Sequence, residues 1–265
     1  MASYREFVNA FRELGLNPSQ PVIVHASLKT VGDIRGGPET VLGALSTLSK
    51  GILAPTFTYK TLIIPPSGPA NNAIAYGTGQ DANRMAEFFM PDMPADPIMG
   101  ILPETLRRSP QARRSIHPIL SFAGINVDAA IDAQTIEDPL APIGVLEAEN
   151  GIVLLIGVDH TVNTSIHYVE QLVGRKRFTR WALTPQGVKE CPNAFSCSQG
   201  FGAAEPYLRP FTRQTSLGGA TLSAVPLRPM IETLAGVLRA SPHALLCERE
   251  GCEQCETVRR CTPAA

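Results

Sequence analysis

The sequence predicts one α/β domain over residues 1–265, with a mixed sheet flanked by helices and an antiparallel C-terminal part. Short apolar stretches rich in β-branched residues, which are typical of buried strands, lie at 21–28, 51–59, 121–126 and 151–158. Helical patterns separate them, and this alternation is the order of βαβ units. Hydrophobic residues make up 44% and charged residues 18%, enough for a sizeable core. We find no internal repeat and no linker.

The first βαβ unit can be followed residue by residue. An amphipathic helix starts after Ser3, a suitable cap, and places Phe7, Val8, Phe11 and Leu14 on one stripe. The strand at 21–28 follows, and a glycine-rich loop then leads to a helix whose first turn holds Pro38. The strand at 51–59 completes the unit, so we expect it to pair in parallel with the strand at 21–28.

The remaining segments have weaker patterns. Residues 60–98 are rich in Pro, Gly, Asn and Asp, which is typical of a functional loop, here a substrate loop or lid. Helical spacing resumes at 99–110, and a short helix is expected at 144–149. Residues 177–192 predict a hairpin that turns at Pro185–Gly187, and 230–242 predict a last amphipathic helix.

Charge and hydropathy limit the partners. The formal net charge is −1, which argues against nucleic acid as a partner, because a phosphate-binding surface needs a basic excess. The charged N-terminal helix does not resemble a signal peptide, and no apolar run is long enough to cross a bilayer. We therefore expect a soluble, cytoplasmic protein with no membrane partner, either a monomer or a homodimer.

All six cysteines lie in the last third of the chain, within the segment 185–265. Disulfides are not the default without a secretion signal. Cys252 and Cys255 form a C-x-x-C, which could be half of a zinc site completed by Cys191, Cys197 or Cys247. The alternative is a set of reduced thiols, which also includes Cys261.

Three polar clusters adjoin the predicted strands. "HASLKTVGDIRGG" begins with His25 and continues through small residues into a helix, an arrangement suited either to anion binding or to a plain connection. "RRSIHP" (113–118) is either a phosphate clamp or a solvated basic turn. "PTFTY" (55–59) places Thr56 at the end of a strand where ligands bind in parallel sheets, although β propensity alone explains a threonine there.

A fourth cluster, "NTSIHYVEQL" (163–172), follows the buried strand "GIVLLIGV" directly. It places His167 and Glu170 three residues apart, and hence on one helix face. Glu170 could hold one ring nitrogen and leave the other as a base. A lone histidine near a strand is more often a satisfied core residue, and no G-x-S-x-G elbow indicates a serine nucleophile.

Taken together, "VHASLKTVGDIRGGPETVLGAL", "GILAPTFTY", "MGILPETLRRSPQARRSIHP", "SFAGIN" and "VLLIGVDHTVNTSIHYVE" resemble the aminoglycoside 3-N-acetyltransferase (antibiotic N-acetyltransferase) family. The resemblance covers roughly residues 5–175, and "RSxHP" and "NTSxHxxE" are its sharpest motifs. It implies the family's own α/β fold and direct acetyl transfer from acetyl-coenzyme A to the 3-amino group of an aminoglycoside antibiotic, as resistance enzymes perform it. The cysteine-bearing C-terminal third does not belong to the pattern of the well-known members.

The resemblance also implies roles for residues. The catalytic set would be His167 as general base, with Glu170 and Thr164 beside it. The segment after the first strand and the "RRSIHP" motif would meet the cofactor through His25, Ser27, Leu28, Thr30, Val31, Gly32, Arg114 and Ser115. Backbone N–H groups near Ser27 and Leu28, or the Thr164 hydroxyl, could stabilise the oxyanion.

The resemblance implies a small-molecule amine as acceptor, and a polycationic one needs an acidic pocket. We assign its contacts to Thr56, His117, Asp92, Asp96 and Asp159. Two alternatives are a different small amine as acceptor and a non-catalytic coenzyme A-binding protein. A third is a zinc hydrolase that uses the histidines, although no H-E-x-x-H spacing supports it; these histidines are His25, His117, His160 and His167.

Overall fold

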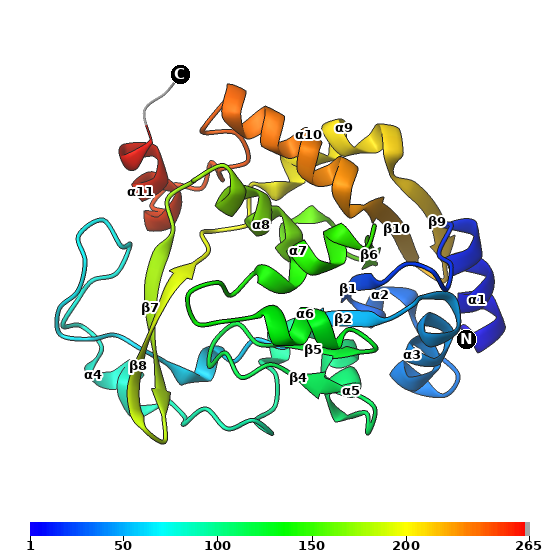
Figure 1. Cartoon of the computed structure of the whole chain (residues 1–265), viewed down its shortest axis with the longest axis horizontal. Helices are drawn as coiled ribbons and strands as arrows, with labels where there is room; N and C mark the ends of the chain where they lie inside the picture. The colour runs from blue at the N-terminus through cyan, green and yellow to red at the C-terminus, as the bar shows by residue number, and fades with distance from the viewer. Residues whose placement is uncertain (263–265) are drawn as a thin grey trace.

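The computed structural model describes residues 1–262 and contains a seven-stranded mixed sheet with the order β4-β5-β2-β1-β6-β10-β9 (Figure 1). The central strand β1 pairs in parallel with β2 and β6, and every other pair in this sheet is antiparallel. The parallel pairing of the first βαβ unit is therefore confirmed. The strands are β1 Val22–Ala26, β2 Ile52–Pro55, β4 Arg113–Arg114, β5 Phe122–Ile125, β6 Ile152–Ile156, β9 Arg213–Leu217 and β10 Ala220–Pro226.

Helices cover both faces of this sheet. Side chains alternate along β1, so Val22 and Val24 face one core and Ile23 faces the other. One core includes α1 Tyr4–Glu13, α3 Gly37–Leu48 and α5 Ile101–Arg108, and the short α2 Leu28–Val31 adjoins it. The other core includes α6 Asp128–Ala133, α7 Ala141–Ala148, α8 Thr164–Leu172, α9 Glu205–Leu208 and α10 Leu227–Ala240.

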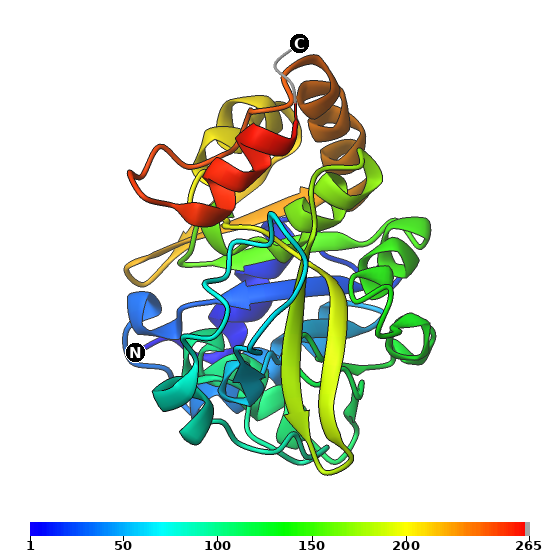
Figure 2. The ribbon, with the colours of Figure 1, turned by 90° about the vertical axis from the view of Figure 1, so that its left-hand side faces the viewer.

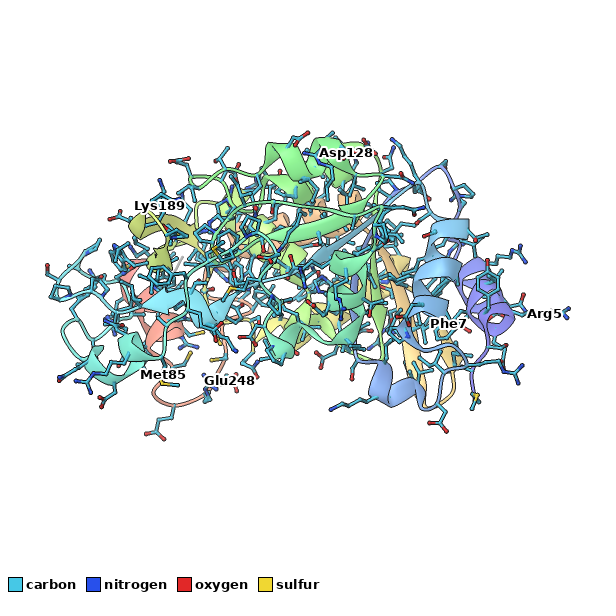
Figure 3. The ribbon with its side chains drawn as sticks, turned by 90° about the horizontal axis from the view of Figure 1, so that it is seen from below. Arg5, Phe7, Met85, Asp128, Lys189 and Glu248 are labelled. Carbon is cyan, nitrogen blue, oxygen red and sulfur yellow. The ribbon has the colours of Figure 1, made fainter. Side chains whose placement is uncertain are left out.

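The first helix begins where the sequence indicates. Ser3 caps α1 in a capping box, with the Ser3 N–H donating to Glu6 Oε2 at 2.8 Å and the Glu6 N–H donating to Ser3 Oγ at 3.4 Å. Figure 3 shows Arg5 of this helix pointing away from the molecule, whereas Phe7 lies on the inner side and is fully buried. The amphipathic pattern thus orients the helix on the sheet.

A second sheet has the order β3-β7-β8, with β3 Leu62–Ile63, β7 Phe178–Thr184 and β8 Gly187–Ala194. The hairpin predicted at 177–192 is confirmed, and its turn lies between Thr184 and Gly187. The segment 60–98 supplies β3 and the short α4 Gln80–Arg84 and is otherwise largely irregular. Figure 2 shows this segment beside the hairpin, with the C-terminal helix α11 (Glu253–Cys261) above both.

Two predictions for the C-terminal part need correction. The helix expected at 230–242 begins at Leu227 and is not the last, because α11 follows it. The sequence pattern misses α11 because its stripe is short: it buries Cys255, Thr257 and Val258 and is otherwise mostly charged. The strands β9 and β10 and the helix α6 were not anticipated either. No helix among the described residues is long and apolar enough to cross a membrane.

Candidate active site

A cavity of about 510 Å³ opens at the carboxyl ends of the parallel strands β1, β2 and β6. Loops that leave parallel strands meet at this edge of the sheet, which is where α/β proteins bind ligands. Two further segments complete the walls: Pro97–Ile101, and Phe195 with Ser198 and Gln199. Polar lining groups come from His25, Ser27, Lys29, Tyr59, Thr161, Asn163, Thr164, His167, Ser198 and Gln199.

His167 lies on the wall of this cavity because α8 begins directly beside it. The Asn163 side chain caps α8 by accepting the Ser165 N–H at 3.1 Å, as the polar start of the motif indicates. One turn on, the Nδ1 atom of His167 lies 2.7 Å from Oε2 of Glu170. Within residues 1–262 no protein group hydrogen-bonds to the His167 Nε2 atom, which is therefore left for a ligand in the cavity.

The Glu170 carboxylate is itself held from two further sides. Arg175 Nη1 donates to Oε1 at 2.7 Å, and Ser196 Oγ lies 3.3 Å from both carboxylate oxygens. The side chains of His167, Glu170 and Arg175 are all less than 5% exposed. A buried carboxylate needs such partners, because an unpaired one loses its hydration without compensation.

Burial sets the protonation states of His167 and Glu170. It lowers the pKa of His167 below its ordinary value, and the attraction of Glu170 only partly opposes the shift because Arg175 and Arg177 lie close by. Burial raises the pKa of Glu170, but hydrogen bonds from His167 and Arg175 and the positive charge of Arg175 outweigh it and hold the pKa below its usual range. At neutral pH the pair is therefore a neutral imidazole, free at Nε2, and an ionised carboxylate.

Aromatic rings fix the orientation of the imidazole. The ring of Phe195 stacks on His167 with centroids 4.1 Å apart and planes 11° from parallel, and Phe201 packs at 4.7 Å. No sequence pattern marks Phe195, Ser196, Ser198 and Gln199 as site residues. These residues lie near position 196, far along the chain from His167, and no periodicity or motif links the two segments.

The loop after β1 contributes to the cavity only in part. Ser27 and Leu28 line it, as does Lys29, which was not anticipated, whereas Thr30, Val31 and Gly32 do not. The Ser27 N–H already donates to the Ile156 oxygen at 2.9 Å, so it is not available to an oxyanion. The Thr30 hydroxyl donates to the Ser27 oxygen at 2.6 Å and fastens the turn.

His25 lines the cavity from the end of β1, and its Nε2 atom is buried without a hydrogen-bond partner among the described residues. Burial, with the nearby His160 adding to it, lowers the pKa of His25 to about 3. His160 lies 3.4 Å from Glu205 and 3.2 Å from the Asn163 side chain. His25 is thus neutral and able to offer a polar contact to a ligand.

The "RRSIHP" motif does not line the cavity. Arg114 donates to the backbone oxygens of Thr56 (2.8 Å), Pro91 (3.2 Å) and Met93, which ties the 91–93 segment to the end of β2. Ser115 pairs with the backbone of Phe122, and His117 Nδ1 accepts the N–H groups of Ile119 and Leu120. Thr56 is fully buried and bonds to Ser121.

None of the carboxylates assigned to the substrate lies in the cavity wall. Asp96 caps a short turn, η2 (Pro97–Met99), and Asp159 caps another, η3 (His160–Val162), so each adjoins lining residues. The Asp92 backbone oxygen accepts from Arg107 at 2.9 Å. The lining holds one exposed cation, Lys29, and no carboxylate among the described residues.

Metal-binding geometry occurs among the cysteines and not among the histidines. In the part of the chain that the structure describes, the one group able to hold a metal is Cys197, Cys247, Cys252 and Cys255, whose Sγ atoms lie within 4.8 Å of one another. Cys191 is buried in β8 and Cys261 is exposed, both outside this group. The histidines proposed for a zinc hydrolase are not part of any such group among the described residues.

Residues 23–239 match the family model described as aminoglycoside 3-N-acetyltransferase. The chain belongs to the aminoglycoside 3-N-acetyltransferase family. The resemblance drawn from the sequence motifs is confirmed, and so is the α/β class that it implied.

Among the relatives, aminoglycoside N(3)-acetyltransferase VII from Streptomyces paromomycinus is 35% identical over 190 residues, 62% of this chain and 59% of that protein. The alignment thus spans about three-fifths of this relative. The crystal structure of the AAC(3)-IVa apoenzyme shares the fold, with a TM-score of 0.77, 23% identity and 98% coverage of both chains. AAC-IIIb, solved as a binary complex with CoASH, has a TM-score of 0.72 and 22% identity, covering 90% of this chain and 96% of AAC-IIIb.

Proposed function

We propose that this family member transfers the acetyl group of acetyl-coenzyme A directly to an amine of an aminoglycoside-type acceptor, with His167 as the general base. The observation that carries the proposal is the His167–Glu170 pair, whose Nδ1 atom is held at 2.7 Å while Nε2 is left for the cavity. The partner on Nδ1 is a buried carboxylate, which can orient the ring and stabilise the imidazolium form. The family name and the CoASH bound to AAC-IIIb support the choice of reaction.

The chemistry requires a base. An ammonium group cannot attack a thioester, so the substrate nitrogen first loses one proton to solvent, and His167 Nε2 takes a second proton from it, directly or through one water, as it attacks. The nitrogen then bonds to the thioester carbon, and the bond from that carbon to sulfur breaks. The imidazolium can return the proton to the departing thiolate, while Glu170 stabilises its charge through Nδ1. No covalent enzyme intermediate is required.

The developing oxyanion needs donors in the same cavity. The Leu28 N–H, at the first turn of α2, and the Thr164 hydroxyl, at the first turn of α8, are the candidates, because the Ser27 N–H is already committed to Ile156. Each lies on a segment that lines the cavity. Fixed donors of this kind stabilise charge that appears only in the transition state.

The two substrates would enter regions of different charge. Ser27, Leu28 and the cation Lys29 form a wall suited to the pantetheine and phosphates of the cofactor, and the earlier assignments of Thr30, Val31, Gly32, Arg114 and Ser115 remain predictions. Asp96 and Asp159 adjoin the rim and would meet ammonium groups of the acceptor there. A cationic acceptor at an anionic rim keeps its charge partly solvated and still paired.

The test is His167→Ala, with His243→Ala as the control because His243 lies after α10 and outside the cavity lining. Thiol release from acetyl-coenzyme A with an aminoglycoside should fall by about 10² or more in His167→Ala, the usual contribution of general-base catalysis. Calorimetry should show unchanged coenzyme A binding. Near-normal turnover in the folded variant would remove His167 from the mechanism. Acetylation of simple amines but of no aminoglycoside would refute the acceptor class and leave the reaction in place.

A further inference from the structure

We propose that Cys197, Cys247, Cys252 and Cys255 bind one zinc ion, and that this ion fixes the segment 195–199 against His167 and Glu170. The positions of the sulfur atoms support the zinc site. A tetrahedral zinc with Zn–S bonds of about 2.3 Å places its sulfurs about 3.8 Å apart. The Sγ atoms of Cys197 and Cys247 lie 3.9 Å apart, and all four lie within 4.8 Å of one another.

The sulfur chemistry favours zinc. Four thiolates form a soft ligand set, which selects zinc or iron, and a closed four-cysteine site is typical of structural zinc. The cysteines come from two distant parts of the chain, namely Cys197 after β8 and the group Cys247, Cys252 and Cys255 around the start of α11. Binding releases the four thiol protons, and the 2+ charge of the ion replaces only part of their charge.

The surroundings of the cluster stabilise thiolates. The Gln199 N–H donates to Cys197 Sγ at 3.4 Å, and Cys252 lies at the N-terminus of α11, where the helix dipole favours negative charge. The guanidinium of Arg259 donates to the Cys247 oxygen at 2.6 Å, and Arg249 lies beside Cys252. A bound tetrathiolate would carry excess negative charge, which these arginines offset.

Little apolar packing holds the C-terminal segment. Its own core contains three cysteines and three other side chains, those of Phe178, Leu246 and Val258. So small a core contributes little stability, and segments of this kind usually need a metal or a disulfide. The site therefore supplies the connection that apolar packing does not.

The second part of the proposal follows from what adjoins Cys197. Phe195, two residues before it, stacks on His167, and Ser196 hydrogen-bonds to Glu170. Gly200 packs against the backbone leading to Cys247 so closely that a Cβ atom there would collide with Leu245. A metal that joins Cys197 to Cys247 would thus fix the cavity wall formed by 195–199 relative to His167 and Glu170.

Arg175 makes the same connection independently. Its Nη1 atom donates to Glu170, and its Nη2 atom donates to the backbone oxygens of Pro242 (2.6 Å) and Ala244 (2.7 Å). Arg175 therefore ties the chain that leads to Cys247 to Glu170. The zinc site itself stands without the proposed function, whereas its effect on acetyl transfer rests on that function.

The experiment measures metal first. Protein from zinc-supplemented cells, purified without chelator, is analysed by native mass spectrometry and elemental analysis. We expect one zinc per chain, lost in Cys252→Ser and Cys255→Ser and kept in Cys261→Ser, a matched control on the same helix whose thiol is exposed and outside the cluster. Zinc-free wild-type protein, iron in place of zinc, disulfides in the cluster, or zinc retained by both ligand variants would each overturn the site.

Hydrogen exchange then tests the coupling. Stripping zinc from the wild type should increase amide exchange in 195–199 while β1 and β6 stay protected, and adding zinc back should reverse the change. Zinc removal should also slow acetyl transfer, mainly through kcat, by roughly tenfold or more. Losses of this size are typical when residues that hold the functional groups of a site in place are removed. Phe195→Ala should lose activity and keep zinc. Unchanged exchange in 195–199 after zinc loss would refute the coupling. If no amine is acetylated by the wild type, the metal and exchange results still decide the site.

Discussion

Lowering the pH should unfold this protein through its buried histidines. His25 and His117 are 5% and 3% exposed, and each has a ring nitrogen with no partner among the described residues. Burial lowers the pKa of His25 to about 3 and that of His117 to about 4, from an ordinary value near 6.5. The unfolded chain therefore binds protons that the folded chain does not bind. The free energy of unfolding must then fall as the pH drops below about 6.5.

The magnitude follows from the size of these shifts. A pH of about 4.5 lies two units below the pKa of a histidine in the unfolded chain. Each of these units lowers the free energy of unfolding by about 1.4 kcal/mol per histidine that stays neutral in the fold. His117 begins to take its proton near this pH, so His25 and His117 together cost about 5 kcal/mol. That loss is comparable to the whole stability of many domains, about 5–15 kcal/mol.

Urea unfolding followed by the fluorescence of Trp181 would measure the loss between about pH 7.5 and pH 4.5. The informative variant is His117→Asn, because the amide oxygen can replace Nδ1 as acceptor for the Ile119 and Leu120 N–H groups without titrating. Its loss of stability should be smaller than that of the wild type by about 2.5 kcal/mol. His243→Asn is the control. If His117→Asn lost as much stability as the wild type, the assignment of His117 as a neutral buried group would be wrong.

Two further predictions concern the catalytic pair and the rim. Glu170→Gln should lower kcat by roughly 10² or more and destabilise the fold by several kcal/mol, because Arg175 is left buried without its carboxylate; adding Arg175→Met should recover stability in urea titrations but not the rate. Asp96→Asn should raise KM for an aminoglycoside in low salt and leave KM for acetyl-coenzyme A unchanged. Asp92→Asn is the comparison. An equal effect of the two variants on KM would contradict a specific role for Asp96.

The sequence was sufficient wherever a local rule applied. Strand character at 151–158 and the i, i+3 spacing of His167 and Glu170 both depend on near neighbours. The hairpin turn at 185–187 has the same origin. Where the pattern was weak, as in α11, the prediction failed because few apolar side chains mark its buried face.

The tertiary structure decided which distant groups meet. Phe195 and Ser196 reach His167 and Glu170, and Cys197 reaches the cysteines around α11, through the path of the chain after β8, which no local periodicity encodes. The same packing keeps Arg114 and His117 out of the cavity, although both belong to the "RRSIHP" motif. Local spacing brings His167 and Glu170 together because a helix repeats every few residues. The surroundings of this pair depend on long-range burial, which only the complete fold determines.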